Sequence, residues 1–370
     1  ESNIHHQVPI YAYPDVHACL AIMKALILFN GFGTTGGGDR NTGNIARALR
    51  AAGHEVRVLN YEGFSLASLA RMRSHARSSD VVIAIDINPV GFAGYAATRF
   101  TGAKFVIVAQ AAYAVAPLYG RKSAWLSKVV YRSADAVVAG SRFVAREIRK
   151  KVPNLTIHVI DPGIDLSQFT GAGRVRPSGS APYMMGVGAV KARKGYDVSL
   201  RAFALLKKDV PDLRYVIVGS QTQEPGYFRH LVELARNLGV ERDVDFVTGA
   251  SDTDLADLYG GASLFILTSV NIGFHFEGFG MVFLEAAAYG LPSIGTSGNG
   301  IEDALEDGRT GILVPQRNPE ATARAALKIL ADSDLAERMR GRARAFAREH
   351  DIGHLTGKYQ DLWHDIGVPG

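Results

Sequence analysis

Two glutamates in an apolar setting are the first residues of this chain that could do chemistry. Glu277 and Glu285 lie eight positions apart in EGFGMVFLEAAAYG, where the other residues are apolar or glycine. A carboxylate buried without a partner is unstable and tends to take up a proton. Glu285, inside FLEAAAY, therefore needs hydrogen-bond donors. The two hydroxyls of a sugar diol could supply them, and so could a buried lysine or arginine.

The residues between the two glutamates predict an anion site. Gly278, Phe279 and Gly280 form a turn, and a helix is predicted to begin near Met281. The amides from Gly280 to Val282 are then free to bind an anion at the positive end of the helix dipole. The segment thus combines an anion site with two carboxylates.

Two further clusters suit phosphate. Lys191, Arg193 and Lys194 lie within VGAVKARKGYD, between an expected strand and an expected helix. Cations there favour a diphosphate, although a solvated loop is the alternative. GFGTTGGGDR, which contains Gly37 and Gly38, also joins an expected strand to a helix, so its amides could approach an anion. It matches neither the dinucleotide fingerprint nor the Walker loop, and a tight structural turn is its alternative.

Apolar runs alternate with amphipathic helical stretches along the whole chain, which predicts parallel sheets covered by helices. With 370 residues, we expect two doubly wound domains, with ligand bound in the cleft between them. The expected strands are KALILFN, EVRVLN, DVVIAID, KFVIVAQ and AVVAG in the first half, and YMMGVGAV, RYVIVGS, DVDFVTG, SLFILTS and LPSIGT in the second.

The expected domain boundaries follow from composition. Residues 23–165 form the first domain and 183–350 the second, joined by a linker at 166–182 that is rich in Gly, Ser and Pro. Residues 1–22 are expected to be an extension outside the fold. Residues 351–370 are expected to form a last helix that returns to the first domain.

The charge is concentrated in the first half. Residues 23–165 hold 19 Lys and Arg against 9 Asp and Glu, or +10, whereas the whole chain is +5. This bias indicates an acidic partner, unless the cations only solubilise helix faces. The single cysteine, Cys19, excludes an internal disulfide framework and a cysteine-based metal cluster.

One basic segment has the pattern of a membrane-surface helix. GRKSAWLSKVVYR places Trp125, Leu126, Val129 and Val130 in an apolar stripe among basic residues. Such a helix can lie on an anionic membrane, although the stripe could instead pack on the sheet. No run reaches the ~18 apolar residues of a membrane span. We therefore expect a cytoplasmic protein, free or peripheral on the cytoplasmic face of a membrane, with no nucleic-acid partner.

The motifs and their order closely resemble the retaining GT-B glycosyltransferases of family 4, whose signature is two glutamates separated by seven residues. The resemblance runs from Met23 to the C-terminus. It includes the glycine-rich first loop, VGAVKARKG, ADAVVAGS, VIDPGIDLSQF, EGFGMVFLEA, GLPSIGT, GIEDALEDGRTGILV and a final helix near GKYQDLWHDIG.

This resemblance implies an α/β GT-B fold and transfer of a hexose from a nucleotide diphosphate sugar, a UDP- or GDP-sugar, to a glycan or lipid-linked acceptor. Glu277 would face the transferred sugar, and Lys194 would stabilise the departing diphosphate; these are the two expected catalytic residues. The expected donor-binding residues are Glu285 at the ribose, Gly37 and Gly38 at the phosphates, and Arg193, Phe279, Gly280, Met281 and Val282 around the sugar and phosphate.

No metal and no further cofactor is expected. Asp252-Thr253-Asp254 matches a metal-binding DxD motif, but it opens a helix, so we interpret it as an N-cap. The family often has an arginine at Ala189, a histidine at Gln110 and a glutamate at Asp303. The missing arginine and histidine favour one alternative, a non-catalytic accessory protein of the GT-B fold. A sugar-nucleotide epimerase of that fold is a second alternative, which the spacing of the two glutamates fits less well. The acceptor-binding residues are not predicted.

Overall fold

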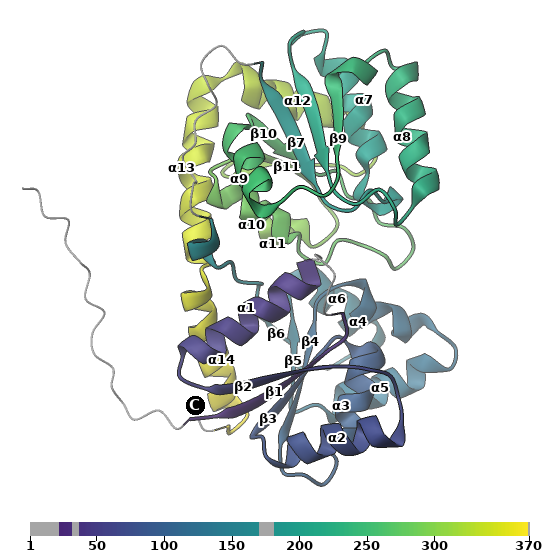
Figure 1. Ribbon diagram of the computed structural model, residues 1–370, viewed down its shortest axis with the longest axis vertical. Helices are drawn as coiled ribbons and strands as arrows, with labels where there is room; N and C mark the ends of the chain where they lie inside the picture. The colour runs from purple at the N-terminus through teal and green to yellow at the C-terminus, as the bar shows by residue number, and fades with distance from the viewer. Residues whose placement is uncertain (1–21, 32–36, 170–180, 369–370) are drawn as a thin grey trace, which may run out of the picture.

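The computed structural model describes residues 22–31, 37–169 and 181–368. Two six-stranded parallel sheets, each covered by helices, lie one above the other along the long axis of the molecule (Figure 1). This confirms the predicted α/β fold of two doubly wound domains. The predicted extension at 1–22 lies outside the described residues except for Ile22. Of the predicted linker at 166–182, residues 170–180 also lie outside them.

The N-terminal sheet has the strand order β2-β1-β3-β4-β5-β6. Its strands are β1 Lys24–Phe29, β2 Glu55–Asn60, β3 Val81–Ile85, β4 Lys104–Ala109, β5 Ala136–Ala139 and β6 His158–Val159. Its helices are α1 Gly37–Ala51, α2 Leu66–Arg77, α3 Phe92–Thr98, α4 Ala112–Val115, α5 Ser123–Ser133 and α6 Arg142–Lys151, with short helical turns at Ile87–Gly91, Ala116–Tyr119 and Leu166–Gln168.

Alternate residues of each central N-terminal strand enter two different cores. In β1, Leu26 and Leu28 pack with α2, α3 and α6, whereas Ala25 and Ile27 pack with α1 and α14 (Ile352–Asp365). Strands buried on both faces read as continuous apolar runs, as β1 and β3 do. Because successive side chains of a strand point to opposite faces, one short sequence contributes to the cores on both sides of the sheet.

The C-terminal sheet has the order β12-β11-β10-β7-β8-β9. Its strands are β7 Tyr183–Val187, β8 Arg214–Val218, β9 Val244–Val247, β10 Leu264–Ile266, β11 Ser293–Thr296 and β12 Gly311–Val314. Its helices are α7 Tyr196–Leu206, α8 Pro225–Asn237, α9 Asp252–Gly261, α10 Met281–Ala288, α11 Ile301–Ala304, α12 Pro319–Ala331 and α13 Ser333–Glu349, with short turns at Ala192–Lys194 and Glu241–Asp243.

Two strands were not predicted, and both lie at a sheet edge. β6 has two residues, and β12 has four with a mixed burial pattern. An edge strand has one neighbour and needs fewer apolar residues than a central strand, so its sequence signal is weaker.

The chain crosses between the domains twice, and the two crossings are hydrogen-bonded to each other. The Ile164 amide donates to the His350 carbonyl at 2.8 Å, and the Ile352 amide donates to the Ile164 carbonyl at 3.0 Å. From there α14 runs down the side of the N-terminal domain, where Tyr359 and Trp363 are fully buried beside Ile45 and Leu49 of α1 (Figure 1).

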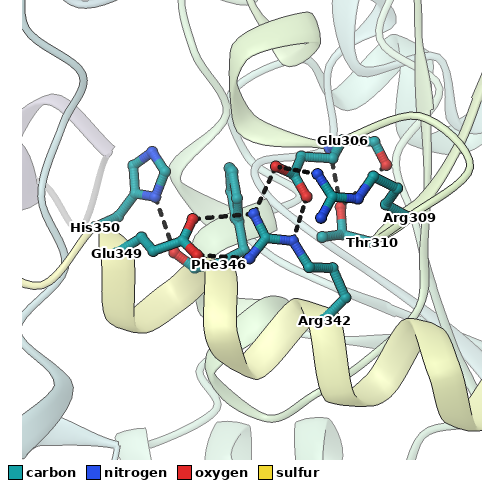
Figure 2. Close-up of polar contacts among 7 residues, drawn as sticks. All are labelled: Glu306, Arg309, Thr310, Arg342, Phe346, Glu349 and His350. Atoms are coloured by element: carbon teal, nitrogen blue, oxygen red, sulfur yellow. Dashed lines mark hydrogen bonds and ion pairs between the residues drawn. The ribbon is translucent and has the colours of Figure 1, made fainter.

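An ion network fixes the end of α13 just before the second crossing (Figure 2). The Arg342 guanidinium donates to Glu306 at 2.6 Å and to Glu349 at 2.6 Å and 3.0 Å. These bonds raise the pKa of Arg342 above its ordinary value. A cavity of about 620 Å³ lies beside the network, lined from both domains by residues such as Arg142, Asp161 and His350. None of the residues predicted to bind the donor lines this cavity.

Candidate functional site

The turn before α10 packs directly against the N-terminal domain. Gly280 has φ 96°, a left-handed conformation that glycine adopts without strain. A Cβ on Gly278 would lie 2.1 Å from the Gln110 carbonyl oxygen, so only glycine fits at this contact. Ser141 of the N-terminal domain donates its hydroxyl to the Gly278 carbonyl. Glu277 therefore sits where the two domains meet.

Glu277 is the centre of a cationic cluster. Its Oε2 accepts from Lys194 Nζ at 2.7 Å, from Arg193 Nη1 at 3.0 Å and from Ser269 Oγ at 3.2 Å. The Lys194 and Glu277 side chains are 11% and 12% exposed. The structure thus joins the two predicted catalytic residues directly, with Arg193 beside them.

The cluster keeps Glu277 ionised. Burial raises the pKa of Glu277, but Lys194 and Arg193 outweigh this effect and lower the pKa to about 2. Burial lowers the pKa of Lys194, and Glu277 acts in the opposite direction. With two cations around one carboxylate, the cluster carries a net positive charge that an incoming anion could neutralise.

Glu285 is buried on α10, and both of its carboxylate oxygens have protein partners. Arg40 Nη1, from α1 of the other domain, donates to Oε1, and the Tyr259 hydroxyl donates to Oε2 at 3.1 Å. Tyr259 stacks on Tyr289, with ring centroids 5.2 Å apart. The alternative partner considered from the sequence, a basic residue, is therefore present.

The other predicted donor-binding residues lie around these two glutamates. The Phe279 and Met281 side chains are buried in the C-terminal core, so these residues could reach a ligand only through their backbone. Val282 is half-buried on α10. Gly37 opens α1, and a Cβ on Gly38 would lie 3.1 Å from Gln110 Oε1.

Asp86, at the end of β3, was not singled out from the sequence. It has φ 65°, which is strained for a residue other than glycine. Its Oδ1 accepts the Gln110 amide at 2.9 Å, and Gln110 and Ala111 are the residues against which Gly278 packs. Asp86 thus anchors the N-terminal wall of the site. Its position just past a strand end is the signal that could have identified it.

The Asp86 carboxyl should make the free energy of unfolding depend on pH. Burial raises the pKa of Asp86 to about 7, against the Gln110 and Ala111 amides. At a pH between 3.8, the pKa in the unfolded chain, and about 7, Asp86 holds a proton in the folded state that it has lost in the unfolded state. Asp86 therefore lowers the free energy of unfolding as pH rises, by at most about 1.4 kcal/mol per pH unit.

Urea unfolding at pH 5, 6, 7 and 8 would test this expectation. The Asp86→Asn variant should gain stability relative to the unsubstituted protein as pH rises from 5 to 7, and level off above. Asp80→Asn is the control, because the Asp80 carboxylate also accepts a backbone amide, that of Lys24 at 2.6 Å. Parallel pH curves for Asp86→Asn and the unsubstituted protein would contradict the assignment.

The predicted N-cap at Asp252 differs from the observed one by one residue. The N-cap of α9 is Ser251, whose hydroxyl accepts the Asp254 amide at 3.1 Å, while the Asp254 carboxylate accepts the Ser251 amide at 3.0 Å. Asp252 is the first helical residue, not the cap. The motif is thus a capping box that starts one residue earlier than predicted.

The apolar stripe predicted on the basic helix is divided between two environments. Val130 of α5 is fully buried, whereas Trp125 is 72% exposed and Leu126 is 37% exposed. The structure therefore assigns Val130 to the core and leaves Trp125 and Leu126 on the surface. Across the described residues, no helix has the length and apolar character needed to cross a membrane.

Taken together, the site offers an ionised carboxylate between two cations, a helix N-terminus and a second buried carboxylate about one turn along that helix. Such a set can bind a diphosphate at one end and a hydroxyl pair at the other. Arg40, Tyr259 and Ser269 complete it and were not predicted. Tyr259 and Ser269 lie in segments that the sequence assigned only as helix and strand.

Comparison with known proteins identifies two family matches that together span most of the chain. Residues 174–346 match "Glycosyl transferases group 1", and residues 60–168 match "Glycosyltransferase Family 4".

Two relatives show how far the sequence similarity extends. A D-inositol 3-phosphate glycosyltransferase from Salinispora arenicola is 33% identical over 59% of this chain and 52% of that protein. A GDP-mannose-dependent alpha-(1-6)-phosphatidylinositol monomannoside mannosyltransferase from Mycolicibacterium smegmatis is 29% identical over 61% of this chain and 63% of that protein. The chain spans about half the length of the first curated relatives it matches.

The fold is shared over nearly the whole chain. A glycosyltransferase from Rickettsia africae superposes with a TM-score of 0.78 at 20% identity, covering 95% of this chain and 100% of the other. Anabaena Alr3699/HepE in complex with UDP and glucose superposes with a TM-score of 0.76 at 18% identity, covering 92% and 99%. The shared two-domain fold is that of the GT-B glycosyltransferases, and the two family matches show that this chain belongs to the family 4 type.

Proposed function

We propose that the protein is a retaining, metal-independent hexosyltransferase that moves a hexose from a UDP- or GDP-sugar to a glycan or glycolipid acceptor. One observation carries the proposal: Glu277 lies ionised between Lys194 and Arg193 at the N-terminus of α10, with Glu285 on the same helix. Cations and free amides suit the diphosphate, and the second glutamate suits the ribose.

The proposed reaction breaks the bond between the sugar anomeric carbon and the diphosphate. Negative charge then builds on the departing phosphate oxygen. Lys194, Arg193 and the α10 amides would stabilise this charge more in the transition state than in the ground state. Glu277 would hold both cations in position and face the transferred sugar. The acceptor hydroxyl would attack from the face that the diphosphate leaves, which retains the anomeric configuration.

The named relatives support the choice of donor and acceptor. The Mycolicibacterium relative is named for GDP-mannose and a phosphatidylinositol mannoside, and the Anabaena structure holds UDP and glucose. The Salinispora relative is named for D-inositol 3-phosphate, an anionic acceptor. We therefore propose a UDP- or GDP-hexose donor and an acceptor that carries phosphate or a lipid.

A panel of UDP- and GDP-sugars incubated without acceptor would test this function. The proposal predicts slow hydrolysis of at least one donor, unchanged by EDTA. A non-catalytic accessory protein, which the replacements Ala189 and Gln110 favour, would bind nucleotide without hydrolysing any donor. An epimerase would convert one sugar nucleotide into its epimer instead. Complete loss of hydrolysis in EDTA, restored by manganese, would overturn the metal-independent mechanism.

We also propose that the exposed part of α5 attaches the protein to anionic lipid, on the cytoplasmic face of a membrane. Trp125 and Leu126 are exposed next to Arg121 and Lys122, which are also exposed. An aromatic residue among cations is typical of peripheral attachment, and each cation contributes on the order of 1 kcal/mol.

Co-sedimentation with vesicles would test this attachment. Binding should require anionic lipid, fall with salt, and drop at least tenfold in the Arg121→Glu/Lys122→Glu variant. The matched control is Lys208→Glu/Arg236→Glu, which makes the same charge change on exposed residues of the C-terminal domain. Equal binding to neutral and anionic vesicles, or none to either, would favour a soluble acceptor.

A further inference from the structure

Arg40 and Glu285 form an ion pair between the two domains, inside the site proposed for the nucleotide. Arg40 lies in the first turns of α1 and Glu285 lies on α10, 245 residues later in the chain. The first turns of α1 point at α10 across the domain boundary (Figure 1). The Glu285 side chain is 3% exposed and the Arg40 side chain 38% exposed. The carboxylate is therefore the buried member of the pair, and solvent reaches only the arginine.

The two partners of Glu285 differ in how easily they could be replaced. Tyr259 is 1% exposed and is held by its stack on Tyr289, so its hydroxyl is fixed. Arg40 is partly solvated and comes from the opposite domain, so its guanidinium can move into water when another donor takes its place on Glu285. A carboxylate this deeply buried cannot lose Arg40 without a replacement, because an unpaired buried charge is strongly destabilising.

We propose that Arg40 and the nucleotide ribose compete for Glu285, so that donor binding exchanges an ion pair between the domains for hydrogen bonds from the ribose hydroxyls. This inference rests on the proposed function, because it takes Glu285 as the ribose ligand. Arg40 is then a residue that sets nucleotide affinity and couples it to the contact between the domains.

The competition is clearest with a neutral nucleoside. Arg40 also carries a positive charge near the proposed diphosphate site, which would favour a nucleoside diphosphate by attraction and obscure the competition. Uridine and guanosine lack phosphate, so for them only competition at Glu285 remains.

The test measures uridine and guanosine affinity by competition with whichever of UDP or GDP binds. If the ion pair is formed about nine-tenths of the time, Arg40→Gln should tighten nucleoside binding by about tenfold. Arg40→Lys retains a cation and should stay near the unsubstituted protein. The matched control is Arg47→Gln: Arg47 lies on the same helix, is 43% exposed and pairs with Asp165 at 3.2 Å, so its loss should change nothing.

A second readout needs no substitution. Salt weakens a partly exposed ion pair, whereas hydrogen bonds from a neutral ribose depend little on salt. Nucleoside affinity of the unsubstituted protein should therefore rise severalfold between low salt and about 0.5 M NaCl, and Arg40→Gln should remove this dependence.

The outcomes separate the two proposals. Weaker or unchanged nucleoside binding by Arg40→Gln, with no salt dependence in the unsubstituted protein, overturns the competition; if Glu285→Gln still weakens binding, the proposed function stands. If neither UDP nor GDP binds the unsubstituted protein, the proposed function fails and the competition fails with it.

Discussion

Glu277→Gln is expected to lower the rate of sugar transfer at least a hundredfold while leaving nucleoside diphosphate affinity nearly unchanged. Glutamine keeps the size of the side chain but loses the charge that holds Lys194 and Arg193 at 2.7 Å and 3.0 Å. Both cations would then lose their common anchor. Loss of one preorganised group at a developing charge typically costs 10²- to 10³-fold, about 2.7–4 kcal/mol.

The measurement is donor hydrolysis and transfer at saturating nucleotide sugar, with nucleotide affinity measured separately. Glu224→Gln is the matched control. The Glu224 Oε2 accepts the Ala192 amide at 2.8 Å and so supports the same loop as Arg193 and Lys194. It should lose less than about tenfold. If Glu277→Gln instead weakens nucleotide binding and leaves the rate intact, Glu277 is not at the reacting centre.

Lys194→Ala is expected to reduce kcat by about a hundredfold or more, with a smaller change in KM. The Lys194 side chain is 11% exposed and its ammonium lies 2.7 Å from Glu277, so the charge acts from a desolvated position where it has a strong effect. Because charge on the diphosphate grows only as the bond to the sugar breaks, the lost stabilisation should affect kcat most.

Lys207→Ala is the control for this lysine. Lys207 is also ion-paired, to Asp243 at 3.0 Å, and is 19% exposed, but it lies at the end of α7 away from the site. Its loss should leave kcat within about twofold. Equal losses in the two variants would indicate a general effect of stability, and a change confined to KM would make Lys194 a residue of ground-state binding only.

The fold could be predicted from the sequence where strands are central and buried. In β3 and β4 nearly every residue is apolar, which a strand covered on both faces requires, so DVVIAID and KFVIVAQ predict both strands. The short edge strand β6 has no such pattern. Its place in the sheet is fixed by pairing of His158 with Val138, a contact that no local sequence pattern encodes.

The parts of the site that lie within one segment of the sequence could be predicted. Glu277 and Lys194 stand out as a carboxylate and a cation in loops after strands, and the family resemblance implies their catalytic roles. The partner of Glu285 could not be named, because Arg40 lies 245 residues away and meets it only when two domains pack together. Asp86 was not predicted because its two distinguishing features, a φ of 65° and a pKa raised by burial, appear only in the folded chain.

The most direct test of the account is the melting temperature of the protein with UDP, GDP and ADP, compared with that of Glu285→Gln and Glu277→Gln. A nucleotide at about 100 times its dissociation constant should add about 2.7 kcal/mol to the free energy of unfolding. We predict that UDP or GDP raises the melting temperature of the unsubstituted protein and of Glu277→Gln, and that Glu285→Gln loses most of this rise. An equal rise in all three proteins, or none with any nucleotide, would contradict a nucleotide-sugar site on α10.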